Sequence, residues 1–206
     1  MEVKNNQSME SVILETAEKL FLEKGFAMTS TTEIAKEVGC NQALVHYYFR
    51  TKENLFNVIF EQKFKEFFQG IFEIKIQDLP FLDKLRFIIE SHFDLLLKNP
   101  RIPLLILNEL SRQPEQINIL REKLHFLPEQ LFTDFDIELQ AEINAGKIRQ
   151  ISIIDLFVTL ISLNVALFIT MPVVEKIIPL NETQKKMLIA HRRAENVDFI
   201  LKSLRP

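Results

Sequence analysis

The sequence predicts an all-α protein of eight to ten helices, and three observations point to this class. Apolar residues recur at helical spacing along nearly all of the 206 residues, and no segment shows the strict alternation of a half-buried strand. Only 4 glycines are present, whereas glycine makes up about 7 % of an average chain. This scarcity disfavours sheets with tight hairpins and excludes a glycine-rich phosphate-binding loop. A hydrophobic fraction of 47 % is sufficient for a buried core.

The first helix is expected at about residues 9–24. Ile13, Ala17 and Leu20 lie there at the spacing of one apolar stripe. Gly25 follows, at the position where helices commonly end on a residue with positive φ.

A second and a third helix are expected at short intervals. Ser30 and Glu33 match a capping box, in which each side chain bonds the backbone N–H of the other residue at a helix start. Gly39 ends this second helix, and Asn41 is a favourable N-cap for a third helix that ends near Phe49.

The fourth helix is expected to be long, from about residue 52 to 76, with Thr51 as its cap and Pro80 beyond its end. A stripe of phenylalanines follows its helical period: Phe56, Phe60, Phe64, Phe67, Phe68 and Phe72. We interpret this stripe as core. An alternative is that its second half borders a ligand pocket.

The remaining chain is expected to form further amphipathic helices, separated by proline and glycine. Their expected ranges are about 81–98, 103–112, 115–145 with a break near Pro128, 153–171 and 182–204. Asn181 and Gln184 would cap the last of them.

The segment 156–174 carries no formal charge and is long enough to be considered as a membrane span. Polar residues such as Thr159 and Asn164 interrupt it, and its flanks are the acidic Asp155 and Glu175 rather than a basic cluster. We therefore expect a helix buried in protein and no membrane partner.

Cys40 is the single cysteine, which excludes an internal disulfide and a cysteine-based zinc site. The N-terminal residues lack an apolar signal core, so a cytoplasmic location is expected. Cys40 is interpreted as a packing residue, with a redox sensor as the alternative.

The segment 31–52 carries the most specific pattern in the chain. Two helices of about eight residues flank a turn at Gly39, with the small Ala35 where the helices would cross and Val45 packed between them. Together these three positions indicate a helix-turn-helix of the DNA-binding type.

The outer face of the third helix has the chemistry that base and phosphate recognition requires. Amides can bond adenine edges, a methyl group can touch thymine, and Tyr or His can bond phosphate. The residues of this face and its N-terminal tip are Asn41, Gln42, Ala43, His46, Tyr47 and Arg50.

The formal net charge of −3 argues against a nucleic-acid partner only when it is counted over the whole chain. No acidic residue lies between Glu37 and Glu53, whereas this window holds Arg50 and Lys52. Few basic contacts predict a shallow salt dependence of DNA binding, since that slope follows the number of neutralised phosphates.

Three motifs in residues 9–60 resemble the DNA-binding domain of the TetR/AcrR family of bacterial transcriptional regulators. They are the run from Ile13 to Gly25, the run from Thr31 to Ala35 with Gly39, and the run from Tyr48 to Phe56. One departure is His46, where the family often has tyrosine.

The resemblance implies a homodimer whose last two helices from each chain form a four-helix bundle. It also implies a helix-turn-helix DNA-binding domain at residues 1–55 and an effector-binding and dimerisation domain at 56–206, connected by the fourth helix. DNA contacts would fall on Thr31, Asn41, Gln42, Ala43, His46, Tyr47 and Lys52.

Helical phase alone places a candidate effector pocket in the second domain. Its lining would be mostly apolar and would fit an aromatic or acyl ligand, with Asn164 as a polar contact. The candidates are Phe87, Phe93, Leu96, Leu107, Phe126, Leu131, Phe157, Ile161, Asn164 and Phe168.

The sequence therefore predicts a ligand-responsive transcriptional regulator. It is expected to be a repressor that binds a near-palindromic operator as a homodimer and is released by a mostly apolar small molecule. No hydrolase elbow, metal motif or nucleophile–base set is found, so neither an enzyme nor a cofactor is expected. The alternative is an all-α ligand carrier or protein-interaction module that has lost DNA binding.

Overall fold

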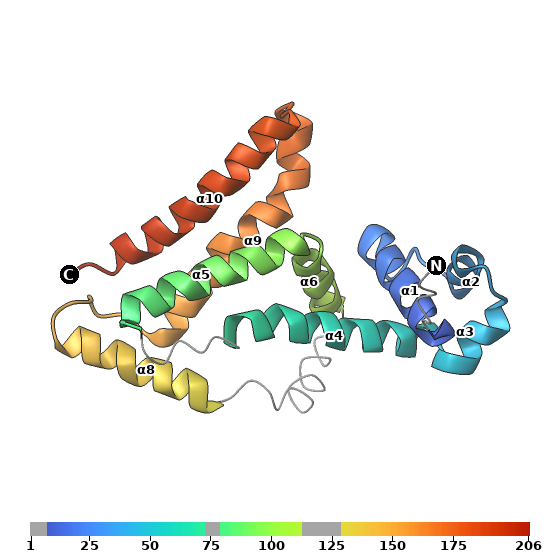
Figure 1. The fold of residues 1–206 in the computed structure, drawn as a ribbon, viewed down its shortest axis with the longest axis horizontal. Coiled ribbons are helices and arrows are strands. Elements are labelled where there is room, and N and C mark those ends of the chain that lie inside the picture. The colour runs from blue at the N-terminus through green and yellow to red at the C-terminus, as the bar shows by residue number, and fades with distance from the viewer. Residues whose placement is uncertain (1–7, 73–78, 113–128) are drawn as a thin grey trace, which may run out of the picture.

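The computed structural model describes residues 8–72, 79–112 and 129–206, and within these ranges it is helical without strands (Figure 1). The helices are α1 (Met9–Lys24), α2 (Thr31–Val38), α3 (Gln42–Phe49), α4 (Lys52–Phe72), α5 (Phe81–Lys98), α6 (Ile102–Arg112), α8 (Glu129–Asn144), α9 (Ile153–Ile177) and α10 (Glu182–Ser203). The all-α prediction is confirmed. The segments 73–76 and 115–128, which were expected to be helical, lie outside the described residues.

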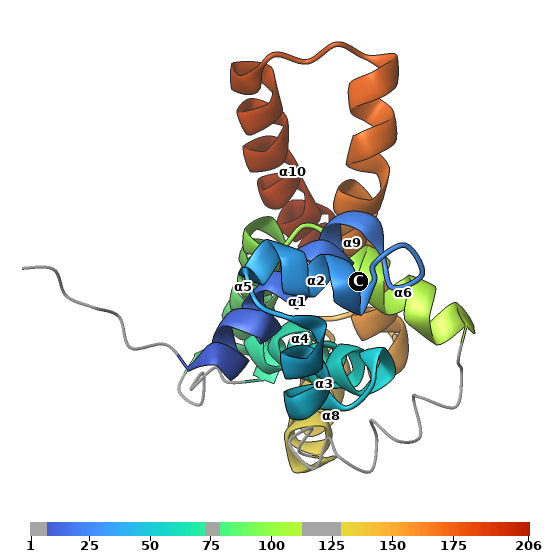
Figure 2. The ribbon, with the colours of Figure 1, turned by 90° about the vertical axis from the view of Figure 1, so that its right-hand side faces the viewer.

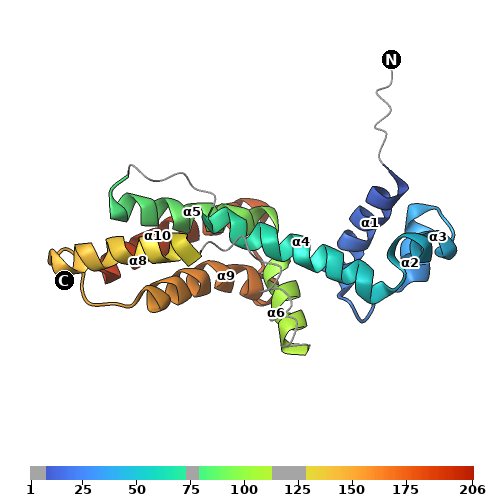
Figure 3. The same cartoon turned by 90° about the horizontal axis from the view of Figure 1, so that it is seen from below.

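Helices α1–α3 form a compact head at one end of the molecule, and α4 leads from it to the larger C-terminal body (Figures 1 and 3). Helices α9 and α10 run antiparallel and project from that body as a hairpin (Figure 2). The head is therefore joined to the body mainly through α4 and the elements that touch it.

The short helices of the head begin where local capping predicts. Asn41 Oδ1 accepts from the backbone N–H of Leu44 at 2.9 Å, and Ser30 Oγ accepts from the backbone N–H of Glu33 at 3.1 Å. The Glu33 carboxylate interacts with the Ser30 backbone and also pairs with Lys24 on α1.

Helix α9 is longer than expected. The sequence predicted an end near residue 171, but the helix continues through Pro172 to Ile177. A proline removes one backbone hydrogen bond and kinks a helix without having to end it. By length and composition α9 could cross a membrane, and 28 % of its most apolar window is buried within the protomer.

Within the described residues, the buried apolar side chains form two hydrophobic clusters. The first runs from the head along α4 into the body and joins Phe21, Val45 and Phe60 to Phe93 and Phe168. The second lies at the far end of the body, where α5, α8, α9 and α10 meet. The domain boundary predicted at residues 55 and 56 falls inside α4 and inside the first cluster.

A buried chain of polar side chains ties α5, α9 and α10 together. Asn164 Nδ2 donates to the Ile89 carbonyl at 2.9 Å and lies 3.2 Å from His92 Nδ1, which therefore acts as an acceptor. Asn196 Nδ2 donates to Asn164 Oδ1 at 2.9 Å, and Arg192 donates to Asn196 Oδ1 at 2.7 Å. Such groups are buried at low cost only when they are bonded to one another.

Burial lowers the pKa of His92 from 6.5 to about 4. Between these two values the unfolded chain binds a proton on His92 that the folded chain does not bind, so stability falls as the pH falls through this window. We expect the free energy of unfolding to drop by about 2 kcal/mol from this group between pH 7 and pH 5. Urea denaturation of the wild type and of His92→Gln at both pH values measures this difference.

In the His92→Gln variant, the free energy of unfolding should no longer show this drop of about 2 kcal/mol between pH 7 and pH 5. The matched control is His191→Gln, because His191 is exposed on α10. An equal pH dependence in the wild type and in His92→Gln would contradict the assignment.

Candidate nucleic-acid interface and effector pocket

The turn between α2 and α3 has the geometry that the sequence predicts. Gly39 adopts φ 78° and ψ 26°, the left-handed conformation that glycine accepts without strain. The Cys40 backbone N–H donates to the Ala35 carbonyl at 2.9 Å, which closes the end of α2. Ala35 and Val45 are buried between the helices, so α3 is held at a fixed angle on the head.

The predicted DNA-contacting residues lie on α3, at its N-cap and at the starts of α2 and α4. Asn41, Gln42, Ala43, His46 and Tyr47 are all exposed along α3. The side chain of Tyr47 is 75 % exposed, and exposed apolar surface of this kind is typical of an interaction site. Thr31 and Lys52 are half-buried at the N-termini of α2 and α4.

Hydrogen bonds organise this surface before any ligand is present. Gln42 Nε2 donates to Thr31 Oγ1 at 2.9 Å and lies 3.3 Å from His46 Nε2. His46 Nδ1 lies 2.9 Å from the Arg50 carbonyl oxygen, which can only accept, so Nδ1 carries the proton. His46 Nε2 is then an acceptor, and the Gln42 amide is oriented by two partners.

Arg50 lies at a strained position that the sequence did not reveal. Its backbone has φ 65° and ψ −59°, and the Thr51 N–H donates to the Phe49 carbonyl at 2.7 Å across it. This is a γ-turn with positive φ, a conformation that is rare and costly for a residue with a side chain. Arg50 is the one residue other than glycine with positive φ among the described residues.

Lys52 is positioned by an aromatic ring at the start of α4. Its Nζ lies 4.1 Å from the centroid of the Phe26 ring, a cation–π contact. Thr51 Oγ1 caps the same helix by accepting from the Asn54 N–H at 3.0 Å. The N-terminus of α4, with this ammonium group beside it, suits a phosphate. Phe26 was not singled out in the sequence, because its ring contacts Lys52 only in the folded head.

Two acidic residues of α2, Glu33 and Glu37, pair with lysines of α1. The hydrogen bond from Lys24 and its charge lower the pKa of Glu33, and Lys19 lies 3.9 Å from Glu37. The exposed face of α3 carries no acidic side chain. The local charge pattern expected from the sequence is therefore present.

The predicted effector-pocket residues do not form one group. Phe93 and Phe168 pack at 5.3 Å between ring centroids in the first cluster, where Leu96 also lies, whereas Phe157 and Ile161 pack against the second. Phe87 and Leu107 are exposed. Phe126 lies outside the described residues, and the side chain of Leu131 is likewise not described.

Asn164 does not offer free polar groups to a ligand in this structure. Its side chain is fully buried, and both its amide and its carbonyl take part in the chain that joins α5 to α10. A ligand contact by Asn164 would require this network to open.

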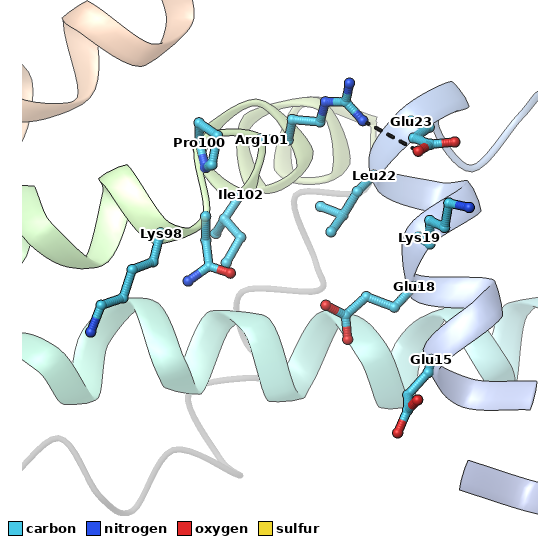
Figure 4. A pocket seen from close by; sticks show the side chains of 10 residues that line it. Glu15, Glu18, Lys19, Leu22, Glu23, Lys98, Pro100, Arg101 and Ile102 are labelled. Carbon is cyan, nitrogen blue, oxygen red and sulfur yellow. Dashed lines mark ion pairs between the residues drawn. The ribbon is translucent and has the colours of Figure 1, made fainter. Parts of the chain in front are cut away.

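Two cavities meet where the body approaches the head. One has a volume of about 520 Å³ and lies between α1 and the turn from α5 to α6 (Figure 4). The other has about 410 Å³ and lies between that turn, α9 and α10. Phe168 is the predicted pocket residue that lines the second cavity.

Replacing Arg50 with glycine should raise the free energy of unfolding by about 1 kcal/mol, since glycine adopts positive φ without the Cβ clash. Urea denaturation at pH 7 measures this change. The control is Lys36→Gly, an exposed position inside α2, which should lower stability by up to about 1 kcal/mol. A loss of stability in Arg50→Gly would show that the γ-turn is not strained.

Comparison with known proteins places this surface in a family. The profile described as bacterial regulatory proteins of the tetR family matches residues 13–59. The chain is 25 % identical over 139 residues to a "Fatty acid metabolism regulator protein" of Bacillus subtilis, covering 67 % of this chain and 70 % of that protein. It is 39 % identical over 66 residues to the B. subtilis HTH-type transcriptional regulator YuxN, covering 32 % of this chain and 23 % of that protein.

Solved structures share the whole fold. A TetR-family regulatory protein from Rhodococcus RHA1 superposes with a TM-score of 0.73 at 19 % identity, covering 97 % of this chain and 98 % of that one. The ketosteroid regulator KstR2 of Mycobacterium tuberculosis gives 0.71 at 14 % identity, covering 97 % and 96 %. Residues 13–59, which hold the helix-turn-helix and the exposed α3, therefore match bacterial regulatory proteins of the tetR family, and the whole chain has the fold of solved TetR-family transcriptional regulators.

Proposed function

We propose that this regulator acts in the cytoplasm as a homodimeric repressor of a near-palindromic operator and is released by a mostly apolar small molecule. The observation that carries the proposal is the pre-organised polar surface of α3 and the N-termini of α2 and α4. Residues 1–55 would serve as the DNA-binding domain and residues 56–206 as the effector-binding and dimerisation domain.

Each predicted DNA-contacting residue of α3 and of the N-termini of α2 and α4 has a role in this proposal. Gln42 and Asn41 would bond base edges in the major groove, and Ala43 would contact a thymine methyl group. His46 and Tyr47 would bond phosphates or bases, and Thr31 and Lys52 would hold the phosphate backbone on either side. Because Gln42 is already oriented by Thr31 and His46, little side-chain conformational entropy would be lost on binding.

The exposed face of α9 supports the proposed dimer. Ser162, Ala166 and Thr170 lie four residues apart on this face and are small enough for a second helix to approach closely. Large apolar side chains flank them, with Ile154, Val158, Val173 and Ile177 between 58 % and 73 % exposed. A partner's α9 and α10 would cover this surface, which gives a physical reason for an apolar helix that is poorly buried in one protomer.

Two similarities support an apolar effector. The B. subtilis relative is a regulator of fatty acid metabolism, and the M. tuberculosis regulator with the same fold is a ketosteroid regulator. Both names refer to apolar compounds, in agreement with the aromatic and aliphatic interior of the body.

DNA binding can be tested by footprinting and gel shift on DNA upstream of the protein's own gene. We expect two protected half-sites roughly 34–36 Å apart. Gln42→Ala should weaken specific binding by about 1–3 kcal/mol and relax the preference at one base pair.

Lys52→Gln should weaken binding to all DNA sequences. It should also reduce by about one the slope of the logarithm of the binding constant against the logarithm of the salt concentration.

The matched control is Arg205→Gln, which removes an exposed charge at the opposite end of the protein. Absence of any protected palindrome would favour the alternative of a carrier or interaction module that has lost DNA binding.

The dimer surface can be tested by Ala166→Arg, which places a long charged side chain in the centre of the exposed face of α9. Light scattering after size-exclusion chromatography should then report a monomer instead of a dimer. The same substitution at the exposed Ala141 on α8 should leave the dimer intact. An unchanged mass for Ala166→Arg would mean that subunits associate elsewhere.

A further inference from the structure

The cavity of about 410 Å³ beside α9 and α10 has the composition of a ligand site. Its volume is within the range of small-molecule pockets, and such pockets are mostly apolar with a few placed polar groups. Eight of its lining side chains are apolar: Leu97, Pro100, Leu104, Phe168, Ile169, Met171, Pro172 and Ile189.

Three charged residues complete the lining, and they leave one cation available to a ligand. Lys185 is held by an ion pair with Glu175, so these two charges cancel within the wall. Arg101 has a looser ion pair, in which its Nη1 lies 3.9 Å from Glu23 Oε1 and its side chain is 58 % exposed.

Arg101 belongs to both cavities. It also lines the cavity of about 520 Å³, where it points toward Glu23 on α1 (Figure 4). Its ion pair therefore joins the α5–α6 turn of the body directly to the first helix of the DNA-binding head. A ligand that attracts Arg101 would weaken this connection.

We propose that the 410 Å³ cavity binds an organic anion with an apolar body, such as a fatty carboxylate. Its chain lies against Phe168, Met171 and Leu104, and its anionic group pairs with Arg101 in place of Glu23. This site differs from the pocket predicted from helical phase and shares only Phe168 with it. The proposal of a ligand site stands by itself, and only the effect of the ligand on DNA affinity rests on the proposed function.

Because the ligand and Glu23 compete for Arg101, ligand binding weakens the Arg101–Glu23 ion pair, and this ion pair weakens ligand binding. If the ligand removes Arg101 from Glu23, then removal of Glu23 must favour the ligand to the same extent. Because the pair is exposed and long, the gain is small, about two- to fivefold in affinity.

The experiment measures binding of dodecanoate and dodecanol to the full-length protein by calorimetry, below the critical micelle concentration. The two probes have the same chain and differ in charge. A charge-assisted hydrogen bond to a partly exposed arginine should make dodecanoate bind about tenfold more tightly. Arg101→Gln should remove this difference, whereas Lys98→Gln, which changes a cation outside the cavity lining, should preserve it.

Two further variants test the cavity wall and the competition. Leu104→Glu places a carboxylate on an exposed wall position and should abolish dodecanoate binding, whereas Leu82→Glu, at a similarly exposed position on α5 outside this lining, should not. Glu23→Gln should tighten dodecanoate binding about two- to fivefold.

Equal dodecanoate affinity in the wild type, Arg101→Gln and Leu104→Glu would overturn the proposal, as would no detectable binding to the wild type. Operator affinity, measured on the same samples, separates the two proposals. If the protein binds an operator but not dodecanoate, the proposed function is supported and the proposed ligand site is wrong. If it binds dodecanoate but no operator, the ligand site is supported and the proposed function is wrong.

Discussion

The aromatic packing along α4 is the constraint on which the rest of the molecule depends. Phe56 lies 5.1 Å from Phe21 on α1 and 4.8 Å from Phe26, between ring centroids, and the row continues through Phe60 to Phe64. Ring pairs of this kind add about 0.5–1.5 kcal/mol each beyond their area burial. Because the row is close-packed, we expect α4 and the head to move together.

Two ion pairs also join α1 to its neighbours. Lys63 on α4 is nearly buried and lies 2.8 Å from Glu18 on α1, while Arg101 reaches Glu23 on the same helix. A buried pair of this kind resists separation because breaking it leaves an uncompensated charge, whereas an exposed pair at 3.9 Å opens readily. The head is therefore held firmly on α4 and only loosely on the turn from α5 to α6.

The head could be predicted almost completely from the sequence because its signals are local. Gly39, the cap at Asn41 and the alternation of buried and exposed residues on α3 act within a few residues of each other. The Glu33 carboxylate of the capping box also pairs with Lys24, a partner that only folding brings close. The γ-turn at Arg50 has no local signal, since nothing in that sequence requires positive φ.

The body could be predicted only as a set of helices. Helical phase states which residues share a face but not which element covers it, so Phe87 and Leu107 were expected in a pocket and lie exposed. The partners of Asn164 are His92 and Asn196, 72 and 32 residues away in the chain. Long-range contacts of this kind leave no trace in spacing or composition.

The buried polar chain through Asn164 also limits how the hairpin of α9 and α10 can move. A slide of α10 by one turn would carry Asn196 away from Asn164 and the Leu163 carbonyl, and would leave several buried donors and acceptors without partners. The hairpin therefore has one favourable register against α5 rather than a continuous range. In the proposed dimer, the distance between the two recognition helices would then be set in part by amide chemistry at the base of the bundle, far from the DNA.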